Sequence, residues 1–202
     1  METKSRKLPR ITFNSPVVLA FVFICVAVQI ASTLTGGAIT RTFFTSRIGA
    51  PFDPLVLFCS VSHIFGHAGW EHLANNMSYI LLLGPLLEEK YGSVRLMWIM
   101  LASALAASIA NAVLLHTAVV GASGVVFTFI LLSSITGLKE GELPLTFLLV
   151  AALYFGQQIY GALFVRDNVS YLGHIAGGAV GAVVGFLIPP KENAAPSGFG
   201  LG

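Results

Sequence analysis

The sequence predicts an all-α fold, a polytopic membrane protein with six transmembrane helices in one bundle. Hydrophobic residues make up 55% of the 202 residues and charged residues only 10%, whereas a soluble domain carries about a quarter charged residues. Long apolar segments recur along the whole chain, and no alternating ten-residue pattern of a membrane barrel is present. Backbone polar groups inside a bilayer must be satisfied within their own segment, so helices are the expected form.

The expected helices follow one another with short links, except after the first. They are residues 16–35, 72–87, 95–115, 121–138, 143–164 and 170–188. A bilayer takes roughly 20 residues to cross, so the first segment should stay as a signal anchor behind a basic cytoplasmic N-terminus, residues 1–15. Residues 16–188 then form the membrane domain, and residues 189–202 a disordered cytoplasmic tail.

The connection between the first two segments, residues 36–71, is long and rich in apolar side chains. Long loops of compact domains tend to be functional or disordered, and this composition argues against disorder. We expect it to fold back and lie partly embedded in the outer membrane interface.

Lysine and arginine placement predicts that both termini are cytoplasmic, since basic residues favour the cytoplasmic side. The cytoplasmic set is Lys4, Arg6, Lys7, Arg10, Lys90, Arg95, Lys139 and Lys191, and the outer set is Arg41, Arg47 and Arg166. The net charge of +2, without a basic stripe, gives no reason to expect a nucleic-acid partner. The cysteines, Cys25 and Cys59, indicate neither a disulfide framework nor a metal site.

Under this topology, the second, fourth and sixth segments all run from the outside inward. His72 and Asn76 of the second, Ser123 of the fourth and His174 of the sixth then lie at similar depth, a few residues below the outer surface. Polar groups inside a membrane usually face a bundle interior or a water-filled cavity. The sequence therefore predicts one polar site built from three distant segments.

Ser123 lies between small residues, Gly121 and Gly124, which leave its hydroxyl accessible. A serine hydroxyl becomes a strong nucleophile when a base removes its proton, and histidine suits that task near neutral pH. His174 follows the first residue of a glycine stripe, which consists of Gly173, Gly177, Gly181 and Gly185. Such a stripe permits close contact between helices. Simple helix packing around Ser123 and a structural hydrogen bond from His174 are the alternatives.

His72 and Asn76 share one helical face because they are four residues apart. Both could donate hydrogen bonds to the oxyanion that forms when a serine attacks an amide, with the Ser123 backbone N–H as a further donor. The alternative for Asn76 is a hydrogen bond that holds two helices together.

Together these motifs resemble the rhomboid family of intramembrane serine proteases, in its minimal six-helix prokaryotic form. The matching stretches are His72 to Asn76, Gly121 to Gly124, Gly173 to Gly177, and the pair Glu88 and Gly92. The resemblance implies a Ser123–His174 dyad without a catalytic acid or cofactor, in a prokaryotic plasma membrane. It also implies transmembrane protein substrates that are cut near the outer face and enter laterally near the second and fifth helices.

The sequence departs from common family patterns at two places. Phe58 and Cys59 occupy the position of a Trp-Arg pair in the first outer loop, which affects how that loop docks. Phe127 stands where some relatives place a tyrosine under the catalytic histidine, and it can pack against that ring without donating a hydrogen bond.

Two other functions remain open. His63, His67 and Glu71 would share a face if their segment were one helix, which would suit a metal-dependent protease or transporter, although glycines interrupt the segment. In that segment His63 and His67 are more simply expected to hold the outer loop by hydrogen bonds. A catalytically silent rhomboid-like binder of transmembrane helices is the second alternative. No feature of the sequence indicates an oligomeric state.

Overall fold

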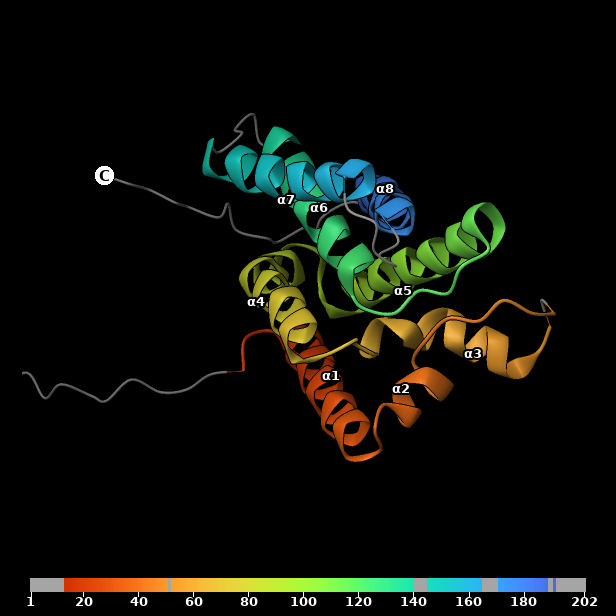
Figure 1. Ribbon diagram of the computed structural model, residues 1–202. Coiled ribbons are helices and arrows are strands. Elements are labelled where there is room, and N and C mark those ends of the chain that lie inside the picture. Colours follow the sequence, from red (N-terminus) through yellow and green to blue (C-terminus); the bar gives the residue numbers. More distant parts are fainter. Residues whose placement is uncertain (1–12, 51, 140–144, 165–170, 189–190, 192–202) are drawn as a thin grey trace, which may run out of the picture.

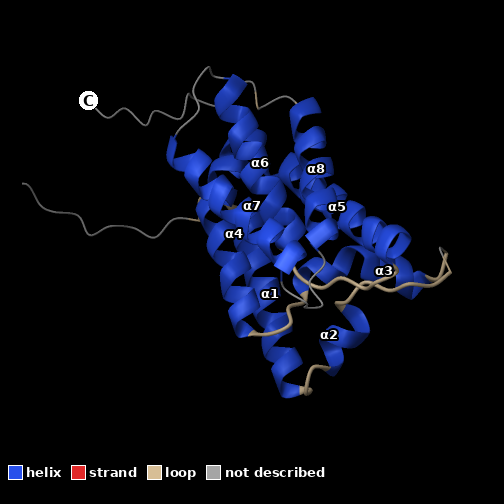
Figure 2. Ribbon diagram, turned by 45° about the horizontal axis from the view of Figure 1, so that its top comes forward, coloured by secondary structure: helices blue, strands red, loops and turns tan. Residues whose placement is uncertain are grey.

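The computed structural model describes residues 13–50, 52–139, 145–164, 171–188 and 191, and every regular element there is helical (Figures 1 and 2). The long helices are α1 (Pro16–Leu34), α4 (Trp70–Tyr91), α5 (Ser93–Ala110), α6 (Ser123–Lys139), α7 (Leu145–Phe164) and α8 (Tyr171–Leu187). The short ones are α2 (Ala38–Phe43), α3 (Pro54–Ser62), the 3-10 turn η1 (His63–Phe65) and the π-helical turn η2 (Asn111–Leu115). The all-α prediction is confirmed for this part of the chain, and each expected segment overlaps one long helix, with α4 extending beyond the expected segment at both ends.

Within the described residues, two helical stretches are long and apolar enough to cross a membrane. They are Pro16–Leu34, with a mean hydropathy of 2.6, and Ser93–Leu115, with a mean hydropathy of 2.0. The expected count of six spans therefore stays a prediction. The expected terminal segments, 1–15 and 189–202, lie largely outside the described residues.

The N-terminus of α1 is capped from another helix. Its own N-cap residue, Ser15, makes no side-chain capping bond. Instead the buried Glu88 of α4 accepts hydrogen bonds from the Val17 and Val18 N–H groups, both at 2.9 Å. Its carboxylate also accepts the Ser93 hydroxyl at 2.7 Å. A carboxylate suits a helix N-terminus because the N–H groups there lack intrahelical partners and carry partial positive charge.

Gly92 makes the tight turn between α4 and α5. Its backbone has φ +81° and ψ 155°, a conformation that is essentially restricted to glycine. The Lys191 N–H donates to the Lys90 carbonyl at 2.8 Å beside this turn. The chain after α8 therefore returns to the end of α4, at the same end of the bundle as the start of α1.

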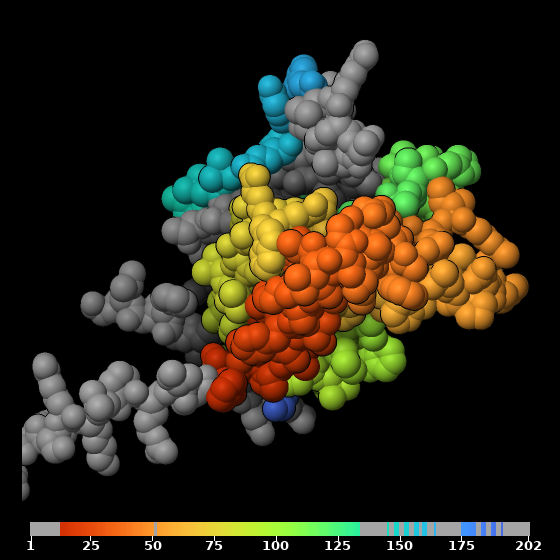
Figure 3. All heavy atoms as spheres, turned by 60° about the horizontal axis from the view of Figure 1, so that its bottom comes forward, coloured from red at the N-terminus to blue at the C-terminus, as the bar shows by residue number. Residues whose placement is uncertain are grey.

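The first loop, residues 35–69, contains the short helices α2, α3 and η1, and on the face shown in Figure 3 it lies beside α1. Asp53 caps α3 by accepting from the Leu55 and Val56 N–H groups at 2.8 and 3.4 Å, and Pro54 begins the helix with a suitable φ. Cys59 is buried with its thiol near the Thr42 and Phe43 carbonyls, whereas Phe58 is half exposed. In place of a Trp-Arg pair, a buried thiol thus joins α3 to α2.

The apolar core lies between α1, α4, α5 and α6, while α8 packs on α5 and α6. Its largest fully buried side chains include Tyr91, Phe127, Phe129, Ile80 and Leu96. α7 contacts α6 and α8. Many core residues belong to α6, so Ser123 stands at the N-terminal end of a closely packed helix.

Candidate active site

His72 and Asn76 lie one turn apart on α4 and face Gly121, in the loop before α6. A Cβ atom at Gly121 would lie 2.6 Å from His72 Cε1, 2.9 Å from His72 Nε2 and 3.8 Å from Asn76 Nδ2. Gly121 also has φ +115°, which an L side chain rarely adopts. Both the space and the backbone therefore require glycine, and the imidazole comes directly against the chain two residues before Ser123.

His72 presents a hydrogen-bond donor toward Gly121. The Ala68 N–H donates to His72 Nδ1 at 3.4 Å. A neutral imidazole that accepts at one nitrogen carries its proton on the other, so Nε2–H faces the loop. The Asn76 Nδ2 donates one hydrogen to the His72 carbonyl at 3.0 Å, and an amide has a second hydrogen to offer. This arrangement suits the binding of a negatively charged or carbonyl oxygen.

Ser123 is the first residue of α6 and is buried, with 5% of its surface exposed. The N–H groups of a first helical turn point out of the helix end, and that of Ser123 follows Gly121 closely. Three potential donors, from His72, Asn76 and the backbone, are therefore gathered at the start of α6.

α8 approaches α6 at two glycines. A Cβ on Gly177 would lie 3.3 Å from the Gly124 Cα, and one on Gly178 would overlap the Phe127 ring. Because Gly124 follows Ser123, and His174 lies one turn before Gly177, the two predicted partners stand on facing stretches of α6 and α8. The His174 side chain lies outside the described residues, as do the surroundings of Gly173 and Gly181.

Thr128 joins the helices around this contact. Its hydroxyl is buried and lies 3.0 Å from Ser103 Oγ, 2.9 Å from the Gly124 carbonyl and 3.1 Å from the Gly177 carbonyl. Ser103 belongs to α5, so this cluster links three helices one turn below Ser123. Phe127 packs against Gly178, as its predicted position under the α8 histidine would require.

The first loop supplies two contacts that the sequence motifs did not indicate. The Gly121 N–H donates to the His63 carbonyl at 3.0 Å, and Ser46 bonds both backbone groups of Val119. Ser46 lies among other polar residues in a loop without periodicity, so no spacing signal could have identified it.

His63 and His67 do not belong to one helix with Glu71. η1 ends at Phe65 and α4 begins at Trp70, so the shared face on which the metal hypothesis depended is absent. Among the described residues, no group of three metal-binding side chains lies close enough to hold an ion. His63 Nε2 instead lies 3.1 Å from the Ala104 carbonyl, which confirms a hydrogen-bonding role for His63. His67 packs edge-on against the His72 ring, 5.2 Å between centroids. The hydrogen bond expected of the His67 side chain was wrong, since both ring nitrogens are buried without a partner among the described residues.

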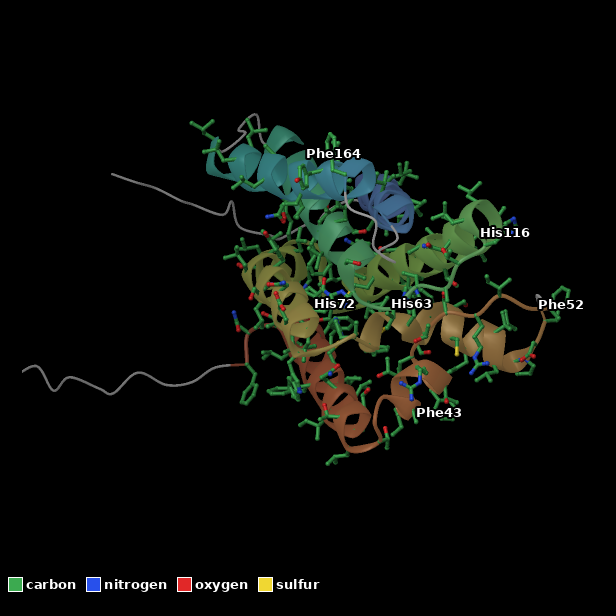
Figure 4. The ribbon with its side chains drawn as sticks, in the orientation of Figure 1. Phe43, Phe52, His63, His72, His116 and Phe164 are labelled. Carbon is green, nitrogen blue, oxygen red and sulfur yellow. The ribbon has the colours of Figure 1, made fainter. Side chains whose placement is uncertain are left out.

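Burial keeps both first-loop histidines neutral. It lowers the pKa of His63 to about 4, although the Ala104 and Gly121 backbone groups favour protonation. Burial, followed by repulsion from His72, lowers the pKa of His67 to about 3. In Figure 4, His63 and His72 lie toward the middle of the molecule, whereas Phe43, Phe52, His116 and Phe164 lie at its periphery.

Comparison with known proteins places these residues in a family. The family model for the rhomboid domain matches residues 56–191, which include all of the site described above except Ser46. Mouse Rhomboid-related protein 2 is 30% identical over 142 residues, covering 63% of this chain and 47% of its own length. Human Rhomboid-related protein 3 is 30% identical over 144 residues, covering 63% of this chain and 35% of its own.

A bacterial relative matches over more of the chain. An uncharacterized protein of Mycobacterium tuberculosis is 27% identical over 210 residues, covering 96% of this chain and 82% of its own length. The chain thus spans less than half of the animal relatives named above and most of the mycobacterial one. Since the rhomboid model covers about two thirds of the sequence, the chain belongs to the rhomboid family.

Proposed function

We propose that the chain is an intramembrane serine endopeptidase that cleaves transmembrane segments of other proteins near the outer face. Ser123 is the nucleophile and His174 the general base. The observation that carries this proposal is the convergence at Gly121, where His72 and Asn76 face the loop that leads into Ser123. The Gly124–Gly177 contact supports it, because that contact joins α6 and α8 one turn from His174.

The proposed reaction follows from these positions. His174 removes the Ser123 proton as Oγ attacks the scissile carbonyl carbon, and the resulting oxyanion accepts hydrogen bonds from His72 Nε2, Asn76 Nδ2 and the Ser123 N–H. The imidazolium then gives its proton to the departing amine, which leaves an acyl-enzyme. A water molecule, deprotonated by His174, hydrolyses that ester and restores the serine. Neither a metal nor a cofactor has a step in this scheme.

As a member of the rhomboid family, the protein is an integral membrane protein built of helices. We propose six spans with both termini cytoplasmic, in a prokaryotic plasma membrane, which the mycobacterial relative supports. The placement of basic residues supports this topology. Lys90 and Lys191 meet at the end of α4, whereas Arg41 and Arg47 lie in the first loop.

We propose that substrates enter laterally between α4 and α7. The support is that α7 packs against α6 and α8 and carries exposed apolar side chains along its length, namely Leu148, Leu149, Leu153, Ile159 and Tyr160. A substrate helix could approach α7 from the lipid, and the polar site at the start of α4 and α6 would receive its unwound segment.

The proposal is tested in proteoliposomes with a model transmembrane substrate. The parent protein should cut it, and Ser123→Ala should abolish cleavage. Ser78→Ala, the same change at an exposed position of α4, should cleave at the parental rate, and a chelator should have no effect. Persistent cleavage by Ser123→Ala would overturn the proposal, and uncut substrate held by the parent protein would favour a silent binder.

A further inference from the structure

Ser46 ties the segment before Ser123 to the first loop. Its N–H donates to the Val119 carbonyl at 2.8 Å, and its hydroxyl accepts from the Val119 N–H, also at 2.8 Å. One residue therefore satisfies both backbone groups of Val119. Ser46 is 3% exposed and Val119 is 6% exposed, so water has little access to replace either bond.

A second contact with the first loop is made two residues later, at Gly121. The Gly121 N–H donates to the His63 carbonyl, and the His63 ring is itself held near the Ala104 carbonyl of α5. We refer to residues 116–122 as the nucleophile loop. The first loop thus holds the nucleophile loop at two residues, Val119 and Gly121. His72 of α4 also lies against Gly121. Figure 3 shows the first loop (orange) beside the chain that follows α5 (green).

The position of the nucleophile loop decides where the Ser123 N–H lies relative to His72 and Asn76. An oxyanion donor is effective only when it points at the place where charge develops, and a displacement of about 1 Å can cost roughly a hundredfold in rate. Val119 is four residues before Ser123. Gly121, which lies between them, has no side chain that could pack against neighbouring elements. The loop therefore depends on external contacts for its position.

We propose that Ser46 is a positioning residue for the reaction, because its hydroxyl holds Val119 and thereby sets the nucleophile loop against His72. This inference rests on the proposed function. Ser46 touches neither substrate nor the reacting atoms, so its contribution should appear in turnover rather than in substrate binding.

Ser46→Ala removes only one of the two bonds, since the Ser46 N–H can still donate to Val119. The Val119 N–H would lose its acceptor in a buried place, and we expect kcat to fall about tenfold while KM changes less than about twofold. Ser46→Thr, which keeps the hydroxyl, should recover most of the loss. Ser60→Ala is the matched control, because that hydroxyl donates within α3 to the Leu57 carbonyl.

Hydrogen exchange read by mass spectrometry tests the contact independently of catalysis. Ser46→Ala should exchange faster across residues 116–122, with α5 unchanged, and Ser60→Ala should match the parent. Unchanged exchange in the loop, or faster exchange with parental kcat, would overturn the positioning role. If the parent protein cleaves nothing while the exchange result holds, the proposed function fails and the catalytic role of Ser46 fails with it, but the Ser46–Val119 contact stands.

Discussion

Gly124 of α6 and Gly177 of α8 bring their helices into backbone contact, with only 3.3 Å between the Gly124 Cα and a Cβ built on Gly177. The contact lies directly after Ser123 and one turn after His174. The distance between those two side chains is therefore governed by how closely α6 and α8 can approach.

The two glycines should respond differently to alanine. A methyl group at Gly177 would meet Ala107 Cβ and the Ser103 carbonyl at 3.1 Å, whereas one at Gly124 would meet its neighbours at 3.5 Å or more. We expect Gly177→Ala to lower the free energy of unfolding by about 1–3 kcal/mol through overpacking and to reduce activity as α8 shifts. Thermal unfolding in detergent checks this. Gly124→Ala should be clearly more stable than Gly177→Ala, and equal stabilities would contradict the packing argument.

His72 and Asn76 should act mainly on turnover. His72→Ala and Asn76→Ala each remove one proposed oxyanion donor, so kcat should fall roughly a hundredfold with a small change in KM. Asn75→Ala provides the control, since Asn75 is adjacent in sequence but exposed. Steady-state kinetics on a fluorogenic transmembrane substrate measures all three. A loss confined to KM would show that these side chains bind substrate without stabilising the transition state.

Glu88 should matter for stability rather than chemistry. Glu88→Gln replaces an acceptor oxygen by an NH₂ group beside the Val17 and Val18 N–H donors. We expect a loss of about 2–3 kcal/mol in the free energy of unfolding, since hydrogen bonds to a buried charge are the strong ones. Its neighbour Glu89 is exposed, so Glu89→Gln should unfold at the parental temperature. A Glu88→Gln protein as stable as the parent would show that the second carboxylate oxygen adds nothing to the cap of α1.

Because the first-loop histidines are buried and neutral, we expect the free energy of unfolding to fall at acid pH. Burial holds the pKa of His67 at about 3 in the folded protein, against 6.5 when exposed. Below pH 6.5 the unfolded chain binds a proton that the folded chain does not, so stability falls as the pH decreases and is unaffected above that range. For His67 alone the loss by pH 5 is about 2 kcal/mol.

Thermal midpoints between pH 7.5 and 5 test this. His67→Phe keeps an aromatic edge for His72 but does not titrate, so its midpoint should fall less than that of the parent. Parallel curves for the two proteins would show that His67 titrates normally in the fold.

The helices, and the approach of His72 and Asn76 to the segment before Ser123, were predictable because each leaves a local pattern. Apolar runs indicate helices, and His72 and Asn76 reveal a shared face by their spacing. The close approach at Gly177 was anticipated from the glycine stripe for the same reason. These signals survive in one sequence because helix geometry fixes which residues are neighbours.

Contacts between loops and distant helices leave no such pattern. Glu88 was recognised by its resemblance to a family feature, yet its role as a cap for α1, about 70 residues earlier, depends on tertiary packing. The Ser46–Val119 contact joins two irregular segments. The face that His63, His67 and Glu71 would share on one helix does not form, because the chain leaves the helix between Phe65 and Trp70, as the intervening glycines suggested.

Labelling by a fluorophosphonate probe, followed by intact-mass measurement of the purified protein in detergent, tests the Ser123–His174 dyad most directly. The parent protein should gain one probe adduct, located on Ser123, and Ser123→Ala should gain none. His174→Ala should fold normally and react far more slowly, because the hydroxyl then lacks its base. Labelling of His174→Ala at the parental rate, or of Ser123→Ala at all, would contradict the account.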